Sequence, residues 1–386
     1  MNPARVLVVL ATEAACMRGI LRGFMAVAHE RDWTLLYYPP GLNLDWVAGT
    51  WTPDAVVFGP ELESKMITRL APAAMVSVTV DRSATGIASV CPDEEGIAAL
   101  ALDHLLTRGF RHLSTFRYDE SPFAVARERA FIERAREAGA DVAAGWGDES
   151  FASSERQESP AAMVAWLRSL PKPCGIFTCA DSWGHPVARY AREAELRVPE
   201  DLALVGVDND ELLCELLSPP LSSVMIPWED VGRQAATLVR LALGDHPIAG
   251  RSVVVYPIDV AARRSSDALA IDDALVATAV AWIREHADHH LTVTMVARAV
   301  GGGRQRLERR FRRSLDRTVQ QEIRRAHVET AKHWLVTTRA SMSEVAERSG
   351  FTNASLLNAA FRREVGMPPG VYRRRVQAQR EKSAGD

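Results

Sequence analysis

Two copies of one short pattern near the C-terminal end of the chain decide how that part folds. The first copy begins Val296-Ala297-Arg298-Ala299-Val300-Gly301 and continues to Leu307 and Phe311; the second begins Val345-Ala346 and continues through Gly350 to Leu357 and Phe361. The small alanine lets two helices cross closely, and the glycine four residues later can adopt the left-handed turn that ends the first helix. Leucine and phenylalanine, four residues apart, bury one face of the next helix. The sequence therefore predicts two helix-turn-helix units.

The sequence around these two units is helical as well. Helices are expected at 272–287, 292–300, 304–314, 319–337, 343–349 and 353–364. The long segment 319–337 would join the two units. The polar stretch after about Arg375 is expected to fray, as chain ends commonly do.

From about residue 5 to 245, short apolar runs alternate with segments of helix length. Strands are expected at 6–10, 34–38, 55–58, 75–78, 112–116, 142–146, 175–178, 203–207 and 222–225. Helices are expected at 17–32, 93–108, 123–138, 158–170, 182–194 and 228–243. This alternation predicts an α/β fold of parallel sheets flanked by helices. Two sets of about five or six strands favour two lobes, because one sheet of that total width would be unusual.

The end of the α/β part is marked by a change of pattern. Residues 251–260 are predicted to form one closing strand, and 261–267 break the pattern as a linker would. A polar stretch at 147–155 is predicted to be a surface loop. We expect a two-lobed domain at 1–262, a linker at 263–271, an all-helical domain at 272–375 and a polar tail at 376–386.

Charge is distributed unevenly along the 386 residues. The net charge is −3, and the chain is 47% hydrophobic and 25% charged, as is ordinary for a globular protein. Residues 266–386 contain 21 Lys or Arg and 14 Asp or Glu, a net charge of +7, whereas residues 1–265 contain 25 and 35, a net charge of −10. A basic domain on an acidic body suggests that only the helical domain meets a polyanion.

The five cysteines are scattered, and none forms a Cys-x-x-Cys pair. A disulfide framework or zinc ribbon is therefore not expected, and a reducing compartment such as the cytoplasm fits best. The apolar run 6–11 is too short for a signal peptide and is interrupted by Glu13. No run reaches about 18 apolar residues, so no membrane span is expected.

Specific residues give both parts a family resemblance. Residues 272–375 resemble the AraC/XylS-type DNA-binding domain through Phe311-Arg312-Arg313, Arg325-x6-Lys332-x2-Leu335 and Pro368-x3-Tyr372-Arg373. Residues 4–262 resemble the effector domain of LacI/GalR regulators and periplasmic sugar-binding proteins through Asp93-x2-Gly96-x6-Asp103-His104, Gly109-x-Arg111-His112, Arg127-x3-Phe131, Asp181 and Val205-Gly206-Val207-Asp208-Asn209. The two together resemble the xylose operon family of activators. The resemblance implies a homodimer, a sugar effector such as D-xylose, and contact with RNA polymerase.

The helical domain offers candidate contacts to DNA on both recognition helices. On the first they are Arg304, Gln305, Arg306, Glu308, Arg309 and Arg313; on the second they are Asn353, Ser355, Asn358 and Arg362. Arg309 could read guanine, Gln305 adenine and Glu308 a cytosine amine. The other arginines could contact phosphates or simply be solvated. Because the second helix offers no arginine to guanine, the first is predicted to dominate specificity.

Candidate ligand-binding residues follow predicted strands, where open α/β sheets bind ligands. They are Arg18, Arg127, Asp181 and Asp208, with Glu13, Asp81, Asn209 and Trp183 as weaker candidates. Carboxylates accept from sugar hydroxyls and guanidinium groups donate to them. Two alternatives stay open at this point: Asp181 could cap the helix that begins near Ser182, and Arg18 could form a salt bridge between the lobes.

No motif in the sequence points to catalysis. Nucleophile-elbow, phosphate-loop and dinucleotide-binding patterns are missing, and the cluster of His286, His289 and His290 has no Cys or carboxylate at metal-ligand spacing apart from Asp288. No metal or cofactor is expected. We predict a non-enzymatic, ligand-responsive regulator that binds double-stranded DNA and activates pentose catabolism genes. The alternatives are the same architecture with another aldose, a sugar phosphate or a nucleoside, or a sugar receptor or enzyme without a DNA role.

Overall fold

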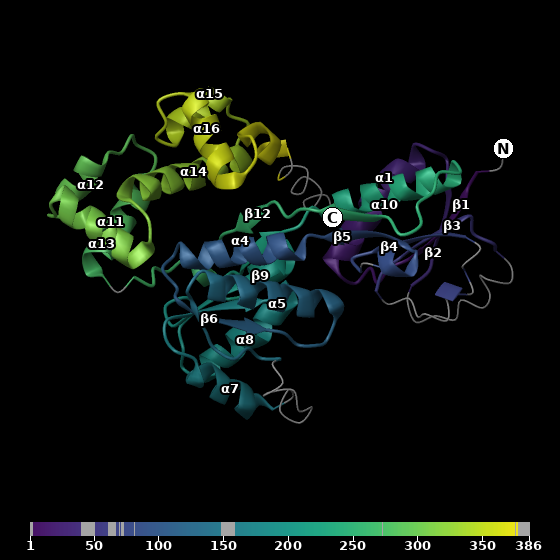
Figure 1. The fold of residues 1–386 in the computed structure, drawn as a ribbon, viewed down its shortest axis with the longest axis horizontal. Helices are drawn as coiled ribbons and strands as arrows, with labels where there is room; N and C mark the ends of the chain where they lie inside the picture. The colour runs from purple at the N-terminus through teal and green to yellow at the C-terminus, as the bar shows by residue number, and fades with distance from the viewer. Residues whose placement is uncertain are drawn as a thin grey trace.

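A computed structural model describes residues 3–39, 51–60, 67–68, 70, 73–80, 82–147, 159–271, 273–374 and 376. Two α/β lobes lie side by side, and a helical domain lies against one of them (Figure 1). Each lobe is built on a six-stranded sheet. The predicted fold class is confirmed. In the described part of the chain, no helix is long and apolar enough to cross a membrane.

The first lobe contains a fully parallel sheet. Its order is β11 (Ser252–Val255), β5 (Ala88–Pro92), β4 (Ala74–Val78), β3 (Ala55–Phe58), β1 (Arg5–Val9) and β2 (Thr34–Tyr37). A short 3-10 turn, η1 (Ser83–Thr85), precedes β5. Helices α1 (Ala15–His29) and α10 (Trp228–Leu243) cover one face of this sheet.

Two glycines let α1 and α10 pack with their backbones almost in contact. A Cβ atom at Gly23 would lie 2.0 Å from the carbonyl oxygen of Glu229, and one at Gly232 would lie 2.0 Å from that of Ile20. No larger residue fits at either position without separating the helices. This contact joins an N-terminal helix to one that follows the second lobe in the sequence.

The second lobe has one antiparallel edge. Its order is β12 (Asp259–Ala261), β10 (Ser222–Met225), β9 (Leu202–Asp208), β8 (Cys174–Thr178), β6 (His112–Phe116) and β7 (Asp141–Val142), with β12 antiparallel to β10. One face is covered by α4 (Glu94–Leu106) and α5 (Pro122–Glu137), and the other by α7 (Pro160–Ser169) and α8 (Asp181–Glu193). The short helix α9 (Glu211–Leu216) follows β9.

The predicted closing strand at 251–260 is wrong, because this segment forms two strands in two sheets. β11 pairs with β5 in the first lobe, and β12 pairs with β10 in the second. Pro257 lies between them and has no N–H to donate to a strand ladder. The chain thus crosses between the lobes here, as it also does before α4 and before α10. The strand predicted at 142–146 is shorter than expected, with only Trp146 bridging to Phe116 beyond β7.

The segment after β12 packs tightly on the second lobe. It includes a 3-10 turn, η2 (Arg264–Ser266), in which Ser265 and Ser266 are fully buried. The Ser265 hydroxyl donates to the Leu204 carbonyl over 2.7 Å and accepts from the Ser222 N–H over 2.8 Å. The loop predicted at 147–155 lies, after Gly147, outside the described residues.

The helical domain contains two helix-turn-helix units joined by a long helix. The first unit is α12 (Val293–Ala299) and α13 (Arg304–Leu315), with α11 (Ala274–Glu285) packed on it; the second is α15 (Met342–Arg348) and α16 (Ala354–Val365); α14 (Val319–Thr337) joins them. Gly301 has φ +64° and Gly350 has φ +73°, which confirms the predicted left-handed turns.

Candidate functional sites: an interlobe cleft and a nucleic-acid interface

A cleft of about 400 Å³ opens where α1 of the first lobe faces the carboxyl end of β9 in the second. Its lining includes Cys16, Arg18, Asp208, Asn209 and Trp228. Parallel strands carry their ligands at this end of the sheet, so the cleft has the position expected of a ligand site.

A buried guanidinium lies beside this cleft among three oxygen acceptors. Arg127, only 2% exposed, donates to Glu94 over 2.6 Å and to the carbonyl oxygen of Cys179 over 2.8 Å. Its Nη1 lies 3.8 Å from Oδ1 of Asp208. The guanidinium also stacks 4.8 Å from the ring centre of Phe123. Arg127 is therefore held rigidly between two carboxylates contributed by different elements.

Burial disfavours the charged form of both carboxyl groups. Burial raises the pKa of Asp208 to about 7, with Arg127 opposing the rise and Glu94 adding to it. The pKa of Glu94 is also raised, again chiefly by burial and against the pull of Arg127. Oδ1 of Asp208 has no hydrogen-bond partner among the described residues, so a hydroxyl group placed here would supply one, which is the chemistry of polyol binding.

The backbone at the end of β9 is strained. Asp208 has φ +109° and Asn209 has φ +52°, conformations that non-glycine residues rarely adopt. Neighbours hold them there: the Asn209 N–H donates to Ser223 over 2.9 Å, and the Asn209 side-chain oxygen accepts from Arg263 over 2.9 Å. Asp181, 1% exposed, accepts the Asp210 N–H over 2.8 Å. Asp181 thus supports the loop after β9, while α8 has no side-chain cap.

The remaining predicted ligand residues are placed as follows. Arg18 lines the cleft and donates to the carbonyls of Thr12 and Glu13; among the described residues, its side chain forms no hydrogen bond or ion pair with the second lobe. The side chain of Glu13 is exposed. Trp183 stacks on Phe123 with ring centres 5.9 Å apart. Asp81 lies outside the described residues.

Sequence reasoning missed Cys16, Glu94, Phe123 and Trp228. Glu94 opens α4 directly after β5, a strand that was not predicted, so its position at a strand end could not be recognised. Phe123 precedes Arg127 by four residues on α5 and therefore shares its face. That spacing was the one available signal.

The first recognition helix, α13, presents a dense row of cations. Leu307, Phe311 and Leu315 are buried. The exposed residues are Arg304, Gln305, Arg306, Arg309, Arg312 and Arg313. Glu308 is half-buried, and its carboxylate accepts the Val319 N–H over 3.4 Å, so it helps to seat α14.

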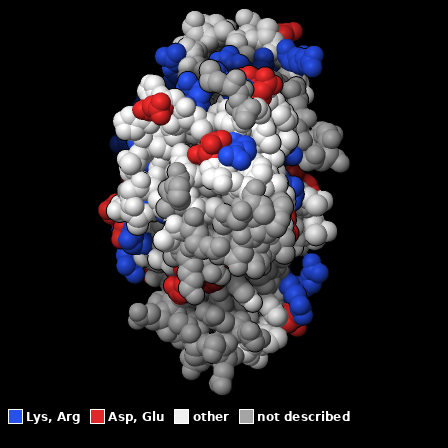
Figure 2. Space-filling model, turned by 90° about the vertical axis from the view of Figure 1, so that its right-hand side faces the viewer, with Lys and Arg blue, Asp and Glu red and all other residues white. Residues whose placement is uncertain are grey.

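The second recognition helix, α16, is better capped and less charged. Asn353 accepts the Leu356 N–H over 2.9 Å as its N-cap. Ser355 and Arg362 are exposed, Asn358 is half-buried, and Leu356 is 52% exposed. Basic side chains are frequent at the upper end of the face in Figure 2, the height at which α15 and α16 lie in Figure 1.

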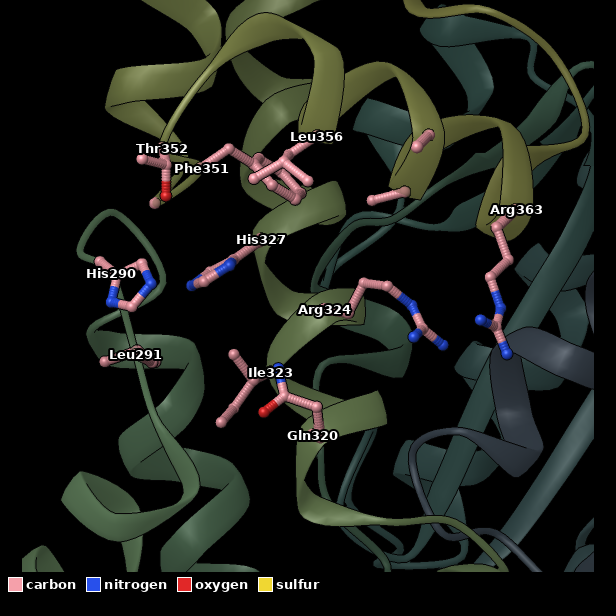
Figure 3. A pocket seen from close by; sticks show the side chains of 13 residues that line it. His290, Leu291, Gln320, Ile323, Arg324, His327, Phe351, Thr352, Leu356 and Arg363 are labelled. Atoms are coloured by element: carbon pink, nitrogen blue, oxygen red, sulfur yellow. The ribbon is translucent and has the colours of Figure 1, made fainter.

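A pocket of about 350 Å³ separates the two units (Figure 3). His327 of α14 projects into it and pairs with the His289 carbonyl over 3.0 Å. Arg324 pairs with Glu364 of α16 over 2.5 Å. The described residues contain no group of three potential metal ligands, and His286 bonds instead to the Trp282 carbonyl.

The second unit is joined to the sheet that forms the cleft. Asp259 of β12, 7% exposed, pairs with Lys332 of α14 over 2.6 Å and accepts the Tyr372 hydroxyl over 3.1 Å. Although burial opposes its charge, the pKa of Lys332 is raised by Asp259 and Glu329, so the amine stays protonated. In register, Asp259 pairs with Met225, which pairs with Asp208 at the cleft.

Comparison with known proteins explains why these two sites occur in one chain. A periplasmic binding protein-like domain matches residues 102–266, and a helix-turn-helix domain matches residues 296–375. The xylose operon regulatory protein of Haemophilus influenzae is 28% identical over 74% of this chain and 74% of its own length. That of Escherichia coli K12 is 28% identical over 74% of this chain and 73% of its own. The chain is therefore similar to these regulators over about three quarters of its length.

A solved structure agrees with this relationship at the level of the fold. It is that of a xylose-binding transcription activator, XylR, with a TM-score of 0.61 and 24% identity over 97% of this chain and 98% of that one. The predicted class is confirmed: a transcription regulator with a helix-turn-helix domain and a sugar-binding type of effector domain. Its relatives are regulators and not enzymes, as was predicted.

Proposed function

We propose that this chain is a cytoplasmic transcription activator that binds D-xylose in the interlobe cleft and binds operator DNA with α13 and α16. The observation that carries the proposal is the pairing of the buried Arg127 with Glu94 and with Asp208, which lines a cleft whose sheet is joined through Asp259 to α14. The names of the relatives support xylose as the first ligand to try.

The cleft chemistry favours a neutral sugar. Arg127 brings one positive charge, but it is already paired with Glu94, and Asp208 lies 3.8 Å from it. A sugar phosphate would place its dianion against these groups, whereas sugar hydroxyls can donate to the carboxylates and accept from the guanidinium. Trp228 and the Phe123–Trp183 pair add apolar surface near the cleft, against which sugar C–H groups can pack.

Transmission to DNA would begin with closure of the lobes on the sugar. Closure shifts an equilibrium only if the sugar binds the closed state more tightly, so it must touch both lobes. Arg18 of the first lobe and Asp208 of the second line the same cleft and meet this requirement. A change at Asp208 reaches Asp259 through two strand pairings, and Asp259 holds Lys332 and Tyr372.

On DNA, we propose that the two recognition helices read successive major-groove segments about 10 bp apart, one turn of duplex. Arg304, Gln305, Arg306, Arg309 and Arg313 of α13 supply base and phosphate contacts; Ser355, Asn358 and Arg362 of α16 supply the rest, with Asn353 as the cap. We further propose, from the resemblance, that two chains pair on the operator and that the dimer contacts RNA polymerase.

Thermal melting against a panel of aldoses, sugar phosphates and nucleosides tests the ligand. A ligand that binds only the folded state raises the melting midpoint. We expect D-xylose to give a rise that Asp208→Asn removes, because the amide keeps the size of the side chain but loses an acceptor oxygen. Asp245→Asn, in the exposed turn after α10, is the control. A rise with sugar phosphates alone would contradict the proposed ligand class.

A further inference from the structure

A wide basic groove separates α13 from the second lobe. It encloses about 950 Å³. One wall consists of Arg306, Arg309, Arg310 and Arg313 from α13, and the other includes Arg111, His112 and Lys172 from the start of β6 and the turn before β8. The second lobe belongs to the acidic part of the chain, so a basic wall here runs against its overall charge.

Several of these cations already have partners. Arg310 pairs with Asp273 over 2.6 Å, and His112 pairs with Asp141 over 3.0 Å. The Lys172 amine donates to the Leu167 carbonyl over 2.7 Å at the end of α7. Among the residues that the structure describes, the side chains of Arg111, Arg306, Arg309 and Arg313 have no hydrogen-bond or ion-pair partner.

These four guanidinium groups face one space from two different domains. Like charges gathered in this way repel one another unless an anion lies between them. Among the described residues that line the groove, the one carboxylate residue is Asp273, which is paired with Arg310, and the groove residue His112 is paired with Asp141. The groove is therefore suited to a ligand with repeated negative charges.

The geometry of α13 indicates which ligand. At 100° per residue, Arg306, Arg310 and Arg313 lie on one flank of the helix, and Gln305 and Arg312 lie on the other. A recognition helix in the major groove has a phosphate strand on each side of it. The DNA strand that faces the Arg306 and Arg313 flank of α13 would run between this helix and the second lobe.

We propose that the second lobe of the effector domain is part of the DNA-binding surface. A DNA phosphate strand lies in the groove, held by Arg306 and Arg313 on one side and by Arg111 on the other. This inference rests on the proposed DNA-binding function and extends it to a residue outside the helical domain. It makes DNA affinity depend directly on where the lobe lies relative to α13.

The test is the salt dependence of duplex binding by the full-length protein. The logarithm of the binding constant falls with the logarithm of salt concentration, with a slope of about −0.9 for each phosphate neutralised. We expect Arg111→Ala to make the slope about 1 unit shallower and to weaken binding to all duplex sequences alike. Arg111→Lys should restore the slope, since an ammonium also neutralises a phosphate.

Arg129→Ala is the matched control, because Arg129 is an exposed arginine of α5 in the same lobe that does not line the groove. Its slope should equal that of the wild type. Equal melting midpoints for the variants exclude misfolding as a cause. Lys172 is not used, because its amine bonds to the end of α7.

The possible failures are distinguishable. No salt-dependent duplex binding by the wild type would overturn the proposed function itself. The wild type could bind duplex, with Arg309→Ala weakening that binding and Arg111→Ala leaving its salt slope unchanged. That result would overturn only the groove inference. Tighter binding by Arg111→Ala would mean that the lobe repels or obstructs DNA. If Arg111→Ala abolishes the binding of inorganic phosphate but leaves the salt slope of duplex binding unchanged, the groove binds a small anion and not a DNA strand.

Discussion

The two helix-turn-helix units share a sequence pattern but differ in what surrounds them. In the first unit, the recognition helix is rich in arginine and follows Gly303, which provides no side-chain cap. The core of this unit is drawn from α11 to α14 and the segment that leads into them. In the second unit, the recognition helix is capped by Asn353 and carries two exposed arginines, Arg362 and Arg363, in its last turn. The core of this second unit continues into the effector domain through Met225 and Ile258.

The difference suggests a division of labour. The first unit has more cations, and its core includes no residue of the sheet that forms the ligand cleft. The second unit has fewer cations and shares a core with that sheet. Affinity and base reading would therefore belong mainly to α13, and the response to ligand would enter mainly through α14 and α16.

The largest expected effect concerns the contact that is special to the second unit. Asp259→Ala leaves the Lys332 amine buried with Glu329 as its remaining partner, so we expect a loss of about 3 kcal/mol of unfolding free energy. The effect of sugar on DNA affinity should shrink as well. Urea unfolding and DNA binding with and without sugar measure the two.

The matched control is Asp103→Ala, which breaks a more exposed pair with Arg325. It should cost less than about 1 kcal/mol, as surface ion pairs do. Equal costs for the two variants, with the sugar response intact in both, would remove the basis for placing the ligand signal in the second unit.

The next effect concerns base reading. Arg309→Ala should lower discrimination between operator and random duplex by roughly 1–3 kcal/mol, the value of one good bidentate contact to a base. Asn358→Ala should lower it less, because Asn358 is half-buried and α16 offers few charged contacts. Competition binding against random DNA compares them. A greater loss with Asn358→Ala would reverse the assignment of specificity.

A smaller effect concerns the helix starts. Asn353→Ala should lower the free energy of unfolding by about 1 kcal/mol, because α16 loses its N-cap. Gly303→Ser should raise it by roughly a few tenths of a kcal/mol, because α13 gains an N-cap. A Cβ at Gly303 meets no atom within 4 Å, and its ψ of 141° suits a capping residue. Hydrogen exchange in the first turns of α13 and α16 measures both. If hydrogen exchange in the first turn of α13 is slower in the wild type than in Gly303→Ser, this account is contradicted.

The smallest effect concerns the joint between the units. Burial lowers the pKa of His327, whose ring donates to the His289 carbonyl. The neutral ring therefore contributes stability that is present above its ordinary pKa of about 6.5 and is lost as pH falls through the lowered value. His327→Gln, which can keep the donor without the charge, should lose less stability than wild type between pH 7 and pH 5. Melting midpoints measured at both pH values test this.

Much of this architecture follows from the sequence because its signals are local. The long helix Val319–Thr337 was predicted to the residue, and its start is fixed locally by a capping box of Thr318 with Gln321. β5 was missed because Ala88–Pro92 buries the small polar Ser89, so it lacks an apolar run. The six-residue helix α9 is too short to show periodicity.

Features that depend on distant partners could not be predicted in the same way. Nothing within 251–260 reveals that its two halves pair with different sheets. Arg127 and Asp208 were recognised by their positions near strand ends, but the role of Glu94 required knowing that α4 lies against α5. The basic groove between Arg111 and α13 likewise exists only once the domains are placed together.

Hydrogen–deuterium exchange of the full-length protein, with and without the sugar that most raises its melting midpoint, tests the division of labour most directly. The account predicts that sugar changes protection in the cleft, in β12, and in α14 and α16, with a smaller change in α12 and α13. Sugar binding that alters α12 and α13 while leaving β12 and α16 unchanged would contradict it.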